Sequence, residues 1–514
     1  MCYHFVRRAV GVTRNRFKVT FMSKAQRVSS GGSIVFLLMA SVVQSFGAPR
    51  GTLQVGAARV DITPVPGAAL PMSGYGNRTQ GFQRIHDHIY VRAIVLSDGS
   101  SQAALIAWEL IAVPTQVWAE LSQRITKELG IPAENLLLAA VHDHGAPSLT
   151  GLDEGPPSSG TIAYTAKVEK DAFEAVRQAK ANLQPAQFGF GTGNAYVNIN
   201  RREFFPQMGW WWLGYNAEGP SDKTLAVLKF SDLSGKPIAL FINYPVHAVV
   251  MGPDNLALTG DLAGATSRYV EDYYRGRVAT RDDAGWELDS GPEVKVDGDG
   301  PVAVWTSGAA GDQNPIAMDR GEDFTMVEGL GRILGEESVR VANSIVAMSS
   351  QASLKGAQRV ITCPGRRVTP GPLPRREYAF EDADPVDIRL SLLQVNEVAL
   401  AGVSGEVFTH IYQRLKQQSP FQATMMVTHA NGYGDYIPSD DAFGQISYEI
   451  VTSELKPGCA ESGIVNGFLQ MMGRTRVKRA GSRPPRLDSR AALAWEDWVG
   501  SFDRLECCPK IRRK

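Results

Sequence analysis

The chain has 514 residues, of which 44% are hydrophobic and 21% charged, as is ordinary for a globular protein. This composition excludes a wholly disordered, collagen-like or polytopic membrane protein, and five cysteines exclude a disulfide-dense scaffold. The formal net charge is zero, so the whole chain offers no electrostatic argument for nucleic-acid binding. The charge is unevenly placed, because residues 48–473 hold 34 basic and 48 acidic side chains while both ends are basic.

The first 47 residues have the layout of a secretory signal peptide. An uncharged run at 33–46 follows Lys24 and Arg27, and small residues precede a cut after Gly47. Met22 is an alternative start that would give a signal of more typical length. The run is too short to span a bilayer comfortably, and a buried or membrane-anchoring segment is the competing interpretation. We therefore expect an exported protein: secreted, periplasmic or at the cell surface.

The rest of the chain divides into a body at 48–473 and a basic tail at 474–514. The tail is rich in Arg, Lys and Pro, which predicts disorder. The acidic body would repel phosphates, so we expect no nucleic-acid partner. An oxidising compartment would allow Cys363 and Cys459 to pair, although the sequence alone does not establish a disulfide.

Strand-like and helix-like segments alternate along the body. Short β-rich apolar runs predict strands, and amphipathic segments predict helices. The strands are expected at 53–62, 90–97, 103–107, 135–141, 225–230, 238–243, 302–306, 390–395 and 398–403, and the helices at 113–129, 163–183 and 326–346. This order predicts an α/β fold: one large domain with a mixed sheet and flanking helices.

Several common catalytic motifs are missing. The sequence contains no G-x-S-x-G, H-E-x-x-H or C-x-x-C motif and no Walker A loop. The glycine-rich stretch 189–193 lacks the third glycine of a dinucleotide fingerprint. These absences argue against a serine α/β-hydrolase, a zincin and a nucleotide-binding enzyme.

Two H-x-H pairs are more informative: His86 with His88, and His142 with His144. The second pair directly follows the buried strand expected at 135–141. Side chains two residues apart on an extended chain face the same way, so His142 and His144 should project together from the strand end. Neutral imidazole is a preferred zinc ligand, and the pattern therefore indicates a metal site.

Other candidate residues are ambiguous on their own. His247 follows a strand, where a lone histidine is more often a hydrogen-bonded structural residue. Glu406 ends a strand and could be a ligand, a base or a neighbour of a helix cap, and the cap is favoured. Asp261 opens an expected helix, and aromatic packing is the default interpretation of Tyr436.

The order of the motifs resembles the catalytic domain of the neutral/alkaline non-lysosomal ceramidase family. The matching segments are G-A-A-R-V-D-I-T at 56–63, S-G-Y at 73–75, I-H at 85–86, R-A at 92–93, V-H-D-H-G-A-P at 141–147, N-I-N-R at 198–201, P-V-H at 245–247, T-G-D at 259–261, G-E at 405–406, and the tyrosines at 436 and 448. The resemblance covers about residues 52–473. Each motif alone is weak, but their collinear order is specific.

The resemblance implies a zinc-dependent amidohydrolase that cleaves the amide bond of an N-acyl (sphingo)lipid with a zinc-activated water. The implied zinc ligands are His142, His247, Glu406 and Tyr436. The implied substrate-binding residues are Arg201, Asn314 and His86. The implied catalytic residues are His144 and Tyr448, as donors to the developing oxyanion, and Asp261 or His144 for proton transfer.

Two features depart from the family pattern. Asn314 stands where the family has a serine in G-D-V-S-P-N, so a serine nucleophile is excluded at this position. A different amide or ester substrate and a non-catalytic lipid-binding relative therefore remain open, although the complete set of four ligands favours an enzyme. The sequence also predicts no C-terminal immunoglobulin-like domain.

The expected partner is an amphipathic N-acyl lipid, and the sequence leaves the oligomeric state open. Trp210, Trp211 and Trp212 follow Phe204 and Phe205. Three adjacent tryptophans cannot all face one core, so some should line an apolar groove or make transient contact with a membrane surface. A loop packed onto the body is the alternative.

Overall fold

The computed structural model describes residues 51–473 apart from 77, 79, 153–154, 278–299, 319–322, 372 and 422. The expected signal peptide at 1–47 and the tail at 474–514 lie outside the described residues. Among the described residues, none of the helices has the length and apolar character needed to cross a membrane.

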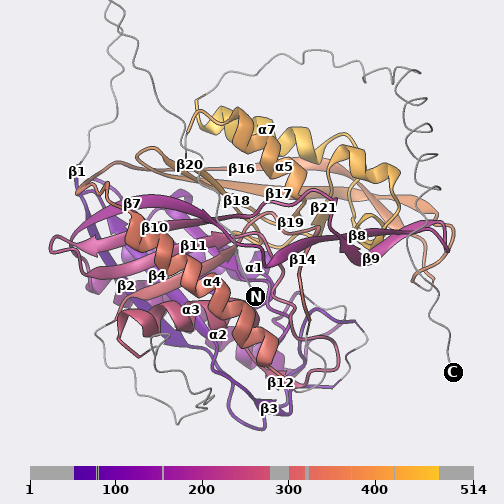
Figure 1. Ribbon diagram of the computed structural model, residues 1–514, viewed down its shortest axis with the longest axis horizontal. Coiled ribbons are helices and arrows are strands. Elements are labelled where there is room, and N and C mark those ends of the chain that lie inside the picture. Colours follow the sequence, from indigo (N-terminus) through magenta and orange to yellow (C-terminus); the bar gives the residue numbers. More distant parts are fainter. Residues whose placement is uncertain are drawn as a thin grey trace, which may run out of the picture. The chain divides into compact units, whose positions relative to one another are not determined.

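A mixed eight-stranded sheet forms the centre of the described body (Figure 1). In spatial order its strands are β13 (Val302–Ser307), β11 (Pro237–Tyr244), β10 (Thr224–Asp232), β7 (Gln184–Asn194), β2 (Gln54–Asp61), β4 (Tyr90–Ser97), β5 (Gln102–Trp108) and β6 (Leu136–Ala140). The pairs β11–β13 and β5–β6 are parallel, and the other pairs are antiparallel. The apolar run of β6 is buried throughout, as expected of a strand covered on both faces.

Helices and a second sheet cover the central sheet. Helices α1 (Thr115–Leu129) and α2 (Ser159–Ala181) share a core with alternate residues of β4 such as Val91 and Val95. The intervening residues, such as Ile94, belong to the core shared with the second sheet, whose strands are β16 (Leu354–Val368), β17 (Phe380–Val395), β18 (Val398–Val403) and β20 (Ala423–Val427). Figure 1 shows this sheet lying between the central sheet and the helices α5 (Thr409–Gln418) and α7 (Ala460–Met471). Helices α3 (Asp261–Tyr274) and α4 (Thr325–Ser344) pack together beside β13, β10 and β7.

Smaller sheets complete the described fold. A three-stranded sheet has the order β14 (Gln313–Pro315), β8 (Asn198–Phe205) and β9 (Trp210–Asn216), and β19 (Glu406–Val407) pairs with β21 (Tyr436–Ile437). The remaining elements are the pairs β1 (Gly51–Thr52) with β15 (Gln351–Ala352) and β3 (Arg84–Ile85) with β12 (Ala257–Leu258), the short helix α6 (Tyr448–Thr452), and 3₁₀ turns at Ala133–Asn135 and Asp440–Gly444.

The expected α/β fold with a large mixed sheet is confirmed, and the expected strands and helices form within a few residues of their expected bounds, except that β17 begins at Phe380, well before the expected start at Leu390. Asn396 begins the tight turn of the expected β17–β18 hairpin with a φ of 52°. The three tryptophans lie half-buried in strand β9 and not in a loop, and their contact with a groove or a membrane stays a prediction. Cys363 of β16 and Cys459 before α7 form a disulfide.

Candidate metal centre

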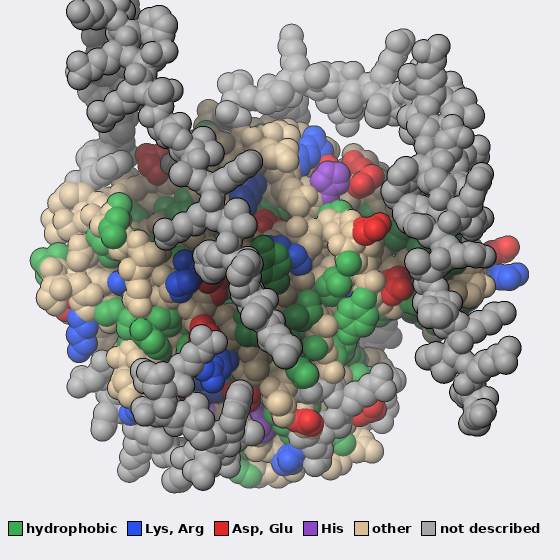
Figure 2. Space-filling model, in the orientation of Figure 1, with side chains coloured by type: hydrophobic (Ala, Val, Ile, Leu, Met, Phe, Trp, Pro, Cys, Tyr) green, Lys and Arg blue, Asp and Glu red, His purple; other side chains and the backbone are tan. Residues whose placement is uncertain are grey.

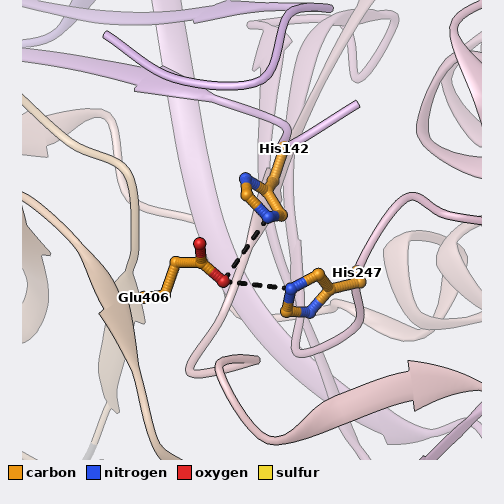
Figure 3. A group of neighbouring side chains, drawn as sticks. All are labelled: His142, His247 and Glu406. Atoms are coloured by element: carbon orange, nitrogen blue, oxygen red, sulfur yellow. Dashed lines mark hydrogen bonds and ion pairs between the residues drawn. The ribbon is translucent and has the colours of Figure 1, made fainter. Parts of the chain in front are cut away.

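Three side chains from distant parts of the chain converge in a buried cluster (Figure 3). His142 lies two residues after β6, His247 lies three residues after β11, and Glu406 begins β19. The Oε2 atom of Glu406 lies 3.1 Å from Nε2 of His247 and 3.5 Å from Nε2 of His142. All three ligand atoms lie within 4.8 Å of one another, close enough for one metal ion to contact all of them.

The outer hydrogen bonds of the two imidazoles determine which atoms face the centre. Nδ1 of His142 lies 2.9 Å from the Ile111 carbonyl oxygen, and Nδ1 of His247 lies 2.9 Å from the Gln313 carbonyl oxygen. A carbonyl oxygen only accepts hydrogen bonds, so each Nδ1 carries the proton and each Nε2 presents a lone pair. Glu406 adds a carboxylate oxygen. Three acceptors without a proton between them repel one another, and a bound cation would turn this repulsion into attraction.

Burial supports the same protonation state. Desolvation lowers the pKa of His142 below its ordinary value, although Glu406 opposes this shift. Desolvation lowers the pKa of His247 further, with the positive charge of Arg201 acting in the same direction. Both imidazoles are therefore neutral near pH 7, the form that coordinates a metal. The residues fit a divalent cation such as zinc, for which two imidazoles and a carboxylate are common ligands.

The H-D-H segment reaches the cluster by a different backbone path from the one expected. His142 has a φ of 63°, in the left-handed region, so the pair does not project from an extended strand. The prediction that the two rings lie together is nevertheless confirmed, because Nε2 of His144 lies 3.3 Å from Nε2 of His142. Gly74 leaves room for His144, since a Cβ atom at that position would lie 2.1 Å from Nδ1 of the ring. The ring edge of Tyr75 covers another side of His144.

Arg201 contacts two other expected site residues, and a third lies beside one of them. The Glu406 and Tyr436 backbones are opposite each other in the β19–β21 pair, and Nη2 of Arg201 donates to the Tyr436 hydroxyl at 2.9 Å. Nη1 of Arg201 donates to Oδ1 of Asn314 at 3.1 Å. The ring of Tyr448 lies 5.9 Å from that of Tyr436. Arg201 thus connects the proposed fourth ligand to the position where the family has its serine.

The structure does not bring two expected residues into this cluster. His86 stacks on Phe324 with ring centroids 3.6 Å apart and approaches Glu328. The carboxylate of Asp261 accepts hydrogen bonds from the backbone N–H groups of Val250, Met251 and Leu262 at 2.6–3.1 Å. Within the described part of the chain, their hydrogen bonds and ion pairs do not include the triad of His142, His247 and Glu406. The functional roles of these two residues stay predictions.

Three further residues at the site differ from what the sequence led us to expect. Glu406 faces two histidines from strand β19, so its interpretation as a helix-cap neighbour is wrong. His429 was not anticipated, yet its buried ring stacks on His142 with centroids 4.0 Å apart and an interplanar angle of 11°. Glu449 was also missed, and its carboxylate accepts from Nε of Arg201 at 2.7 Å. The position of His429, two residues after β20, repeats that of His142 after β6 and was the available signal.

The central sheet, the second sheet and the triad define the class: an α/β protein with a buried candidate metal centre where the sheets meet. Residues 53–323 match the family model described as neutral/alkaline non-lysosomal ceramidase, N-terminal. This match spans more than half of the chain, and the chain belongs to that family.

Similar sequences include the neutral ceramidase of Drosophila pseudoobscura pseudoobscura, which is 26% identical over 349 residues, or 64% of this chain and 48% of that protein. Neutral ceramidase 1 of Arabidopsis thaliana is 25% identical over 266 residues, or 48% of this chain and 32% of that protein. The chain therefore matches about half or less of the length of these relatives.

Two solved structures share the fold. A structure titled "Ceramidase complexed with C2" superposes with a TM-score of 0.64 at 17% identity, covering 82% of this chain and 75% of the other. The crystal structure of the neutral ceramidase from Pseudomonas aeruginosa gives a TM-score of 0.62 at 16% identity, covering 84% and 76% of the two chains. At these identities, the likeness establishes the fold alone.

Proposed function

We propose that this protein is a zinc-dependent amidohydrolase that cleaves the amide bond of an N-acyl lipid, with ceramide as the leading substrate. The observation that carries the proposal is the buried triad of His142, His247 and Glu406, whose facing atoms are all acceptors, in a member of the ceramidase family. Burying three mutually facing acceptors raises the free energy of the metal-free folded protein, and a bound cation would remove this cost.

The ligand set would be completed by the hydroxyl of Tyr436, which Arg201 holds by a hydrogen bond. When bound, zinc supplies Lewis acidity, which polarises the scissile carbonyl and makes water a better nucleophile near neutral pH. Glu449 pairs with the buried Arg201 guanidinium, so Arg201 stays charged and oriented.

Neighbouring side chains would handle charge and protons during amide cleavage. The Tyr448 hydroxyl would donate to the oxygen on which negative charge develops, an interaction that is stronger in the transition state than in the ground state. Burial lowers the pKa of His144 well below its ordinary value, so a proton accepted by its ring would pass readily to the leaving amine.

Asn314 would offer the substrate different hydrogen bonds from those of the family serine, so it bears on which substrate the site accepts. Its Oδ1 accepts from Arg201, so its Nδ2 is directed away from the guanidinium and is left to donate. The family serine hydroxyl can both donate and accept, whereas the Nδ2 group of Asn314 can only donate. A different amide or an ester is therefore the second candidate substrate.

An exported location is part of the proposal. The disulfide between Cys363 and Cys459 supports it, because disulfides persist mainly in oxidising compartments. The signal peptide itself falls on residues that the structure does not describe.

The test combines metal analysis of the purified mature chain with hydrolysis of a fluorescent N-acyl sphingosine. We expect one zinc per chain and release of the fatty acid. One zinc without turnover of this substrate, followed by turnover of other amides or esters, would support the second candidate. No zinc after reconstitution, together with lipid binding, would contradict the enzyme and favour a non-catalytic lipid-binding protein.

A further inference from the structure

The β8–β9 hairpin presents an uncharged aromatic surface. Residues 204–216 contain no charged side chain. Phe204 and Trp211 lie opposite each other in the hairpin, with ring centroids 5.5 Å apart. We define the hairpin surface as the exposed or half-exposed side chains of Phe204, Met208, Trp211, Leu213 and Tyr215. Figure 2 shows further hydrophobic side chains to the right of the centre of this face, close to where Figure 1 places β14 and β8.

The hairpin that carries this surface also reaches the candidate site. Strand β8 carries Arg201 three residues before Phe204, so one strand supplies both the site and the surface. On β9, the ring of Trp212 lies 5.9 Å from that of Tyr448. Nε of Arg202 donates to the Ser447 hydroxyl, which anchors the base of the hairpin to the segment before α6.

We propose that the hairpin surface docks on an electrically neutral lipid bilayer and brings the candidate site to its substrate; this inference rests on the proposed function. Tryptophan and tyrosine combine an apolar body with a polar tip and favour the membrane–water interface. The hairpin has no Lys or Arg at 204–216, so its attraction does not depend on anionic headgroups. Exposing apolar surface to water costs free energy, so transfer of the hairpin surface from water into the membrane–water interface would be favourable.

The test measures co-flotation of the full chain with phosphatidylcholine vesicles. We expect the wild type to bind at low and high NaCl alike. The triple variant Phe204→Ala/Trp211→Ala/Leu213→Ala should bind at least about tenfold more weakly, because it lacks three large apolar side chains. The matched control is Leu233→Ala, which removes an exposed apolar side chain from the turn between β10 and β11 and should bind like the wild type.

Activity on a soluble short-chain N-acyl substrate separates this inference from the proposed function. The triple variant should hydrolyse that substrate like the wild type while failing on vesicle-embedded substrate. The inference is overturned if the triple variant binds vesicles like the wild type, or if the wild type binds only anionic vesicles and is released by salt. If the wild type binds neutral vesicles without hydrolysing either substrate, the docking surface stands and the proposed function fails.

His429 contacts two of the segments that carry the triad, the one with His142 and the one with Glu406. Its backbone N–H donates to the Gly405 carbonyl, next to Glu406, and its carbonyl accepts from the N–H of Ala140, two residues before His142. Its ring stacks on His142. His429 holds these contacts with a φ of 52°, a conformation that is uncommon for a residue other than glycine.

The geometry points to His429 as a positioning residue that fixes the plane of the His142 imidazole and thereby the direction of its Nε2 lone pair. The stacked ring prevents rotation about the side-chain bonds of His142, while the hydrogen bond from Nδ1 to the Ile111 carbonyl fixes the same plane from the opposite edge. Groups that orient metal ligands affect affinity without touching the metal.

Two variants distinguish the effect of the His429 ring from the effect of its backbone conformation. His429→Asn tolerates a positive φ but lacks a ring, and His429→Phe retains a ring face without nitrogen atoms. By chelator competition we expect zinc affinity to fall about tenfold or more in His429→Asn and to be largely retained in His429→Phe. Thermal unfolding of the metal-free proteins verifies that each variant folds. Wild-type zinc affinity in a folded His429→Asn, or an equal loss in both folded variants, would overturn the inference.

Discussion

At the scale of single residues, two hydrogen bonds from Nδ1 atoms to backbone carbonyls decide what the site can bind. They direct the lone pairs of His142 and His247 toward the same carboxylate oxygen. The sequence predicted both residues as ligands because of their family positions, but it could not show the carbonyls of Ile111 and Gln313. Those carbonyls come from segments far from the histidines in the chain, so only folding brings them into place.

The first prediction concerns the ligands. His142→Ala or Glu406→Ala should lose bound zinc and hydrolytic activity together, because each removes one of three converging donor atoms. Metal content and turnover of the purified variants provide the measurement. His410→Ala is the control, since His410 is exposed and faces Asp441 outside the triad. Full zinc occupancy in both ligand variants would refute the assignment.

Asn314→Ser restores the residue type that the family has at this position. Serine lacks the amide oxygen that Arg201 contacts and supplies a hydroxyl that can donate and accept. If Asn314 sets substrate choice, the ratio of kcat/KM for ceramide to that for the preferred substrate should rise by about tenfold, the effect of roughly one hydrogen bond. An unchanged ratio would mean that the side chain does not contact the substrate.

At the scale of secondary-structure elements, helix α3 and the chain after β11 are held together by a buried carboxylate. Asp261 begins α3 with a φ of 47° and accepts hydrogen bonds from Val250 and Met251, beyond His247. Burial raises the pKa of Asp261 to about 6. The folded protein therefore binds this proton more tightly than the unfolded chain, where an Asp has a pKa of about 3.9.

The stabilisation from protonated Asp261 is complete below about pH 4 and is lost as the pH rises through about 6. The free energy of unfolding of the wild type, minus that of the non-titrating variant Asp261→Asn, should thus fall by about 2 kcal/mol between about pH 4 and about pH 7. Denaturant unfolding of metal-free protein at several pH values provides the measurement. A constant difference would contradict the raised pKa.

The disulfide ties strand β16 to the start of helix α7 and closes a loop over 96 positions of the sequence. Because it restricts the unfolded chain, the double variant Cys363→Ser/Cys459→Ser should lose about 2–4 kcal/mol of unfolding free energy. Denaturant unfolding of the oxidised wild type, the reduced wild type and the variant gives the comparison. Equal stability of all three would mean that the bond does not form in solution.

At the scale of the described body, the candidate metal centre joins segments that are distant in the chain. His142 and His247 follow strands of the central sheet, whereas Glu406 lies beyond the last residue of β18 in the second sheet. A cation held by all three would therefore link the sheets in the folded state only. Zinc would stabilise the fold as a ligand that binds the native state.

Removal of the metal should accordingly lower the melting temperature. At a free zinc concentration one hundred times the dissociation constant, the stabilisation is about 2.7 kcal/mol, and it should disappear on chelation. Differential scanning calorimetry with and without a chelator measures the effect. In Glu406→Ala the melting temperature should not respond to zinc, and a response equal to that of the wild type would place the metal elsewhere.

The sequence by itself determined most strands of the central sheet, although not β7, and through the family resemblance it predicted the three residues of the triad. Runs such as 135–141 are apolar throughout and can be stable only between two covered faces, and the motif order assigned His142, His247, Glu406 and Tyr436 to one site. These features are local in the chain or follow from the family resemblance. They do not depend on how distant segments approach one another.

Only the tertiary structure decided the surroundings of the triad. The stacking of His429 on His142, the pairing of Arg201 with Glu449 and the stacking of His86 on Phe324 all join residues that are far apart in the sequence. Such contacts depend on the packing of one sheet against another, and a periodic pattern in one segment carries no information about its partner. The positive φ of His142 is a further case, because tertiary contacts hold it in a conformation that local preference disfavours.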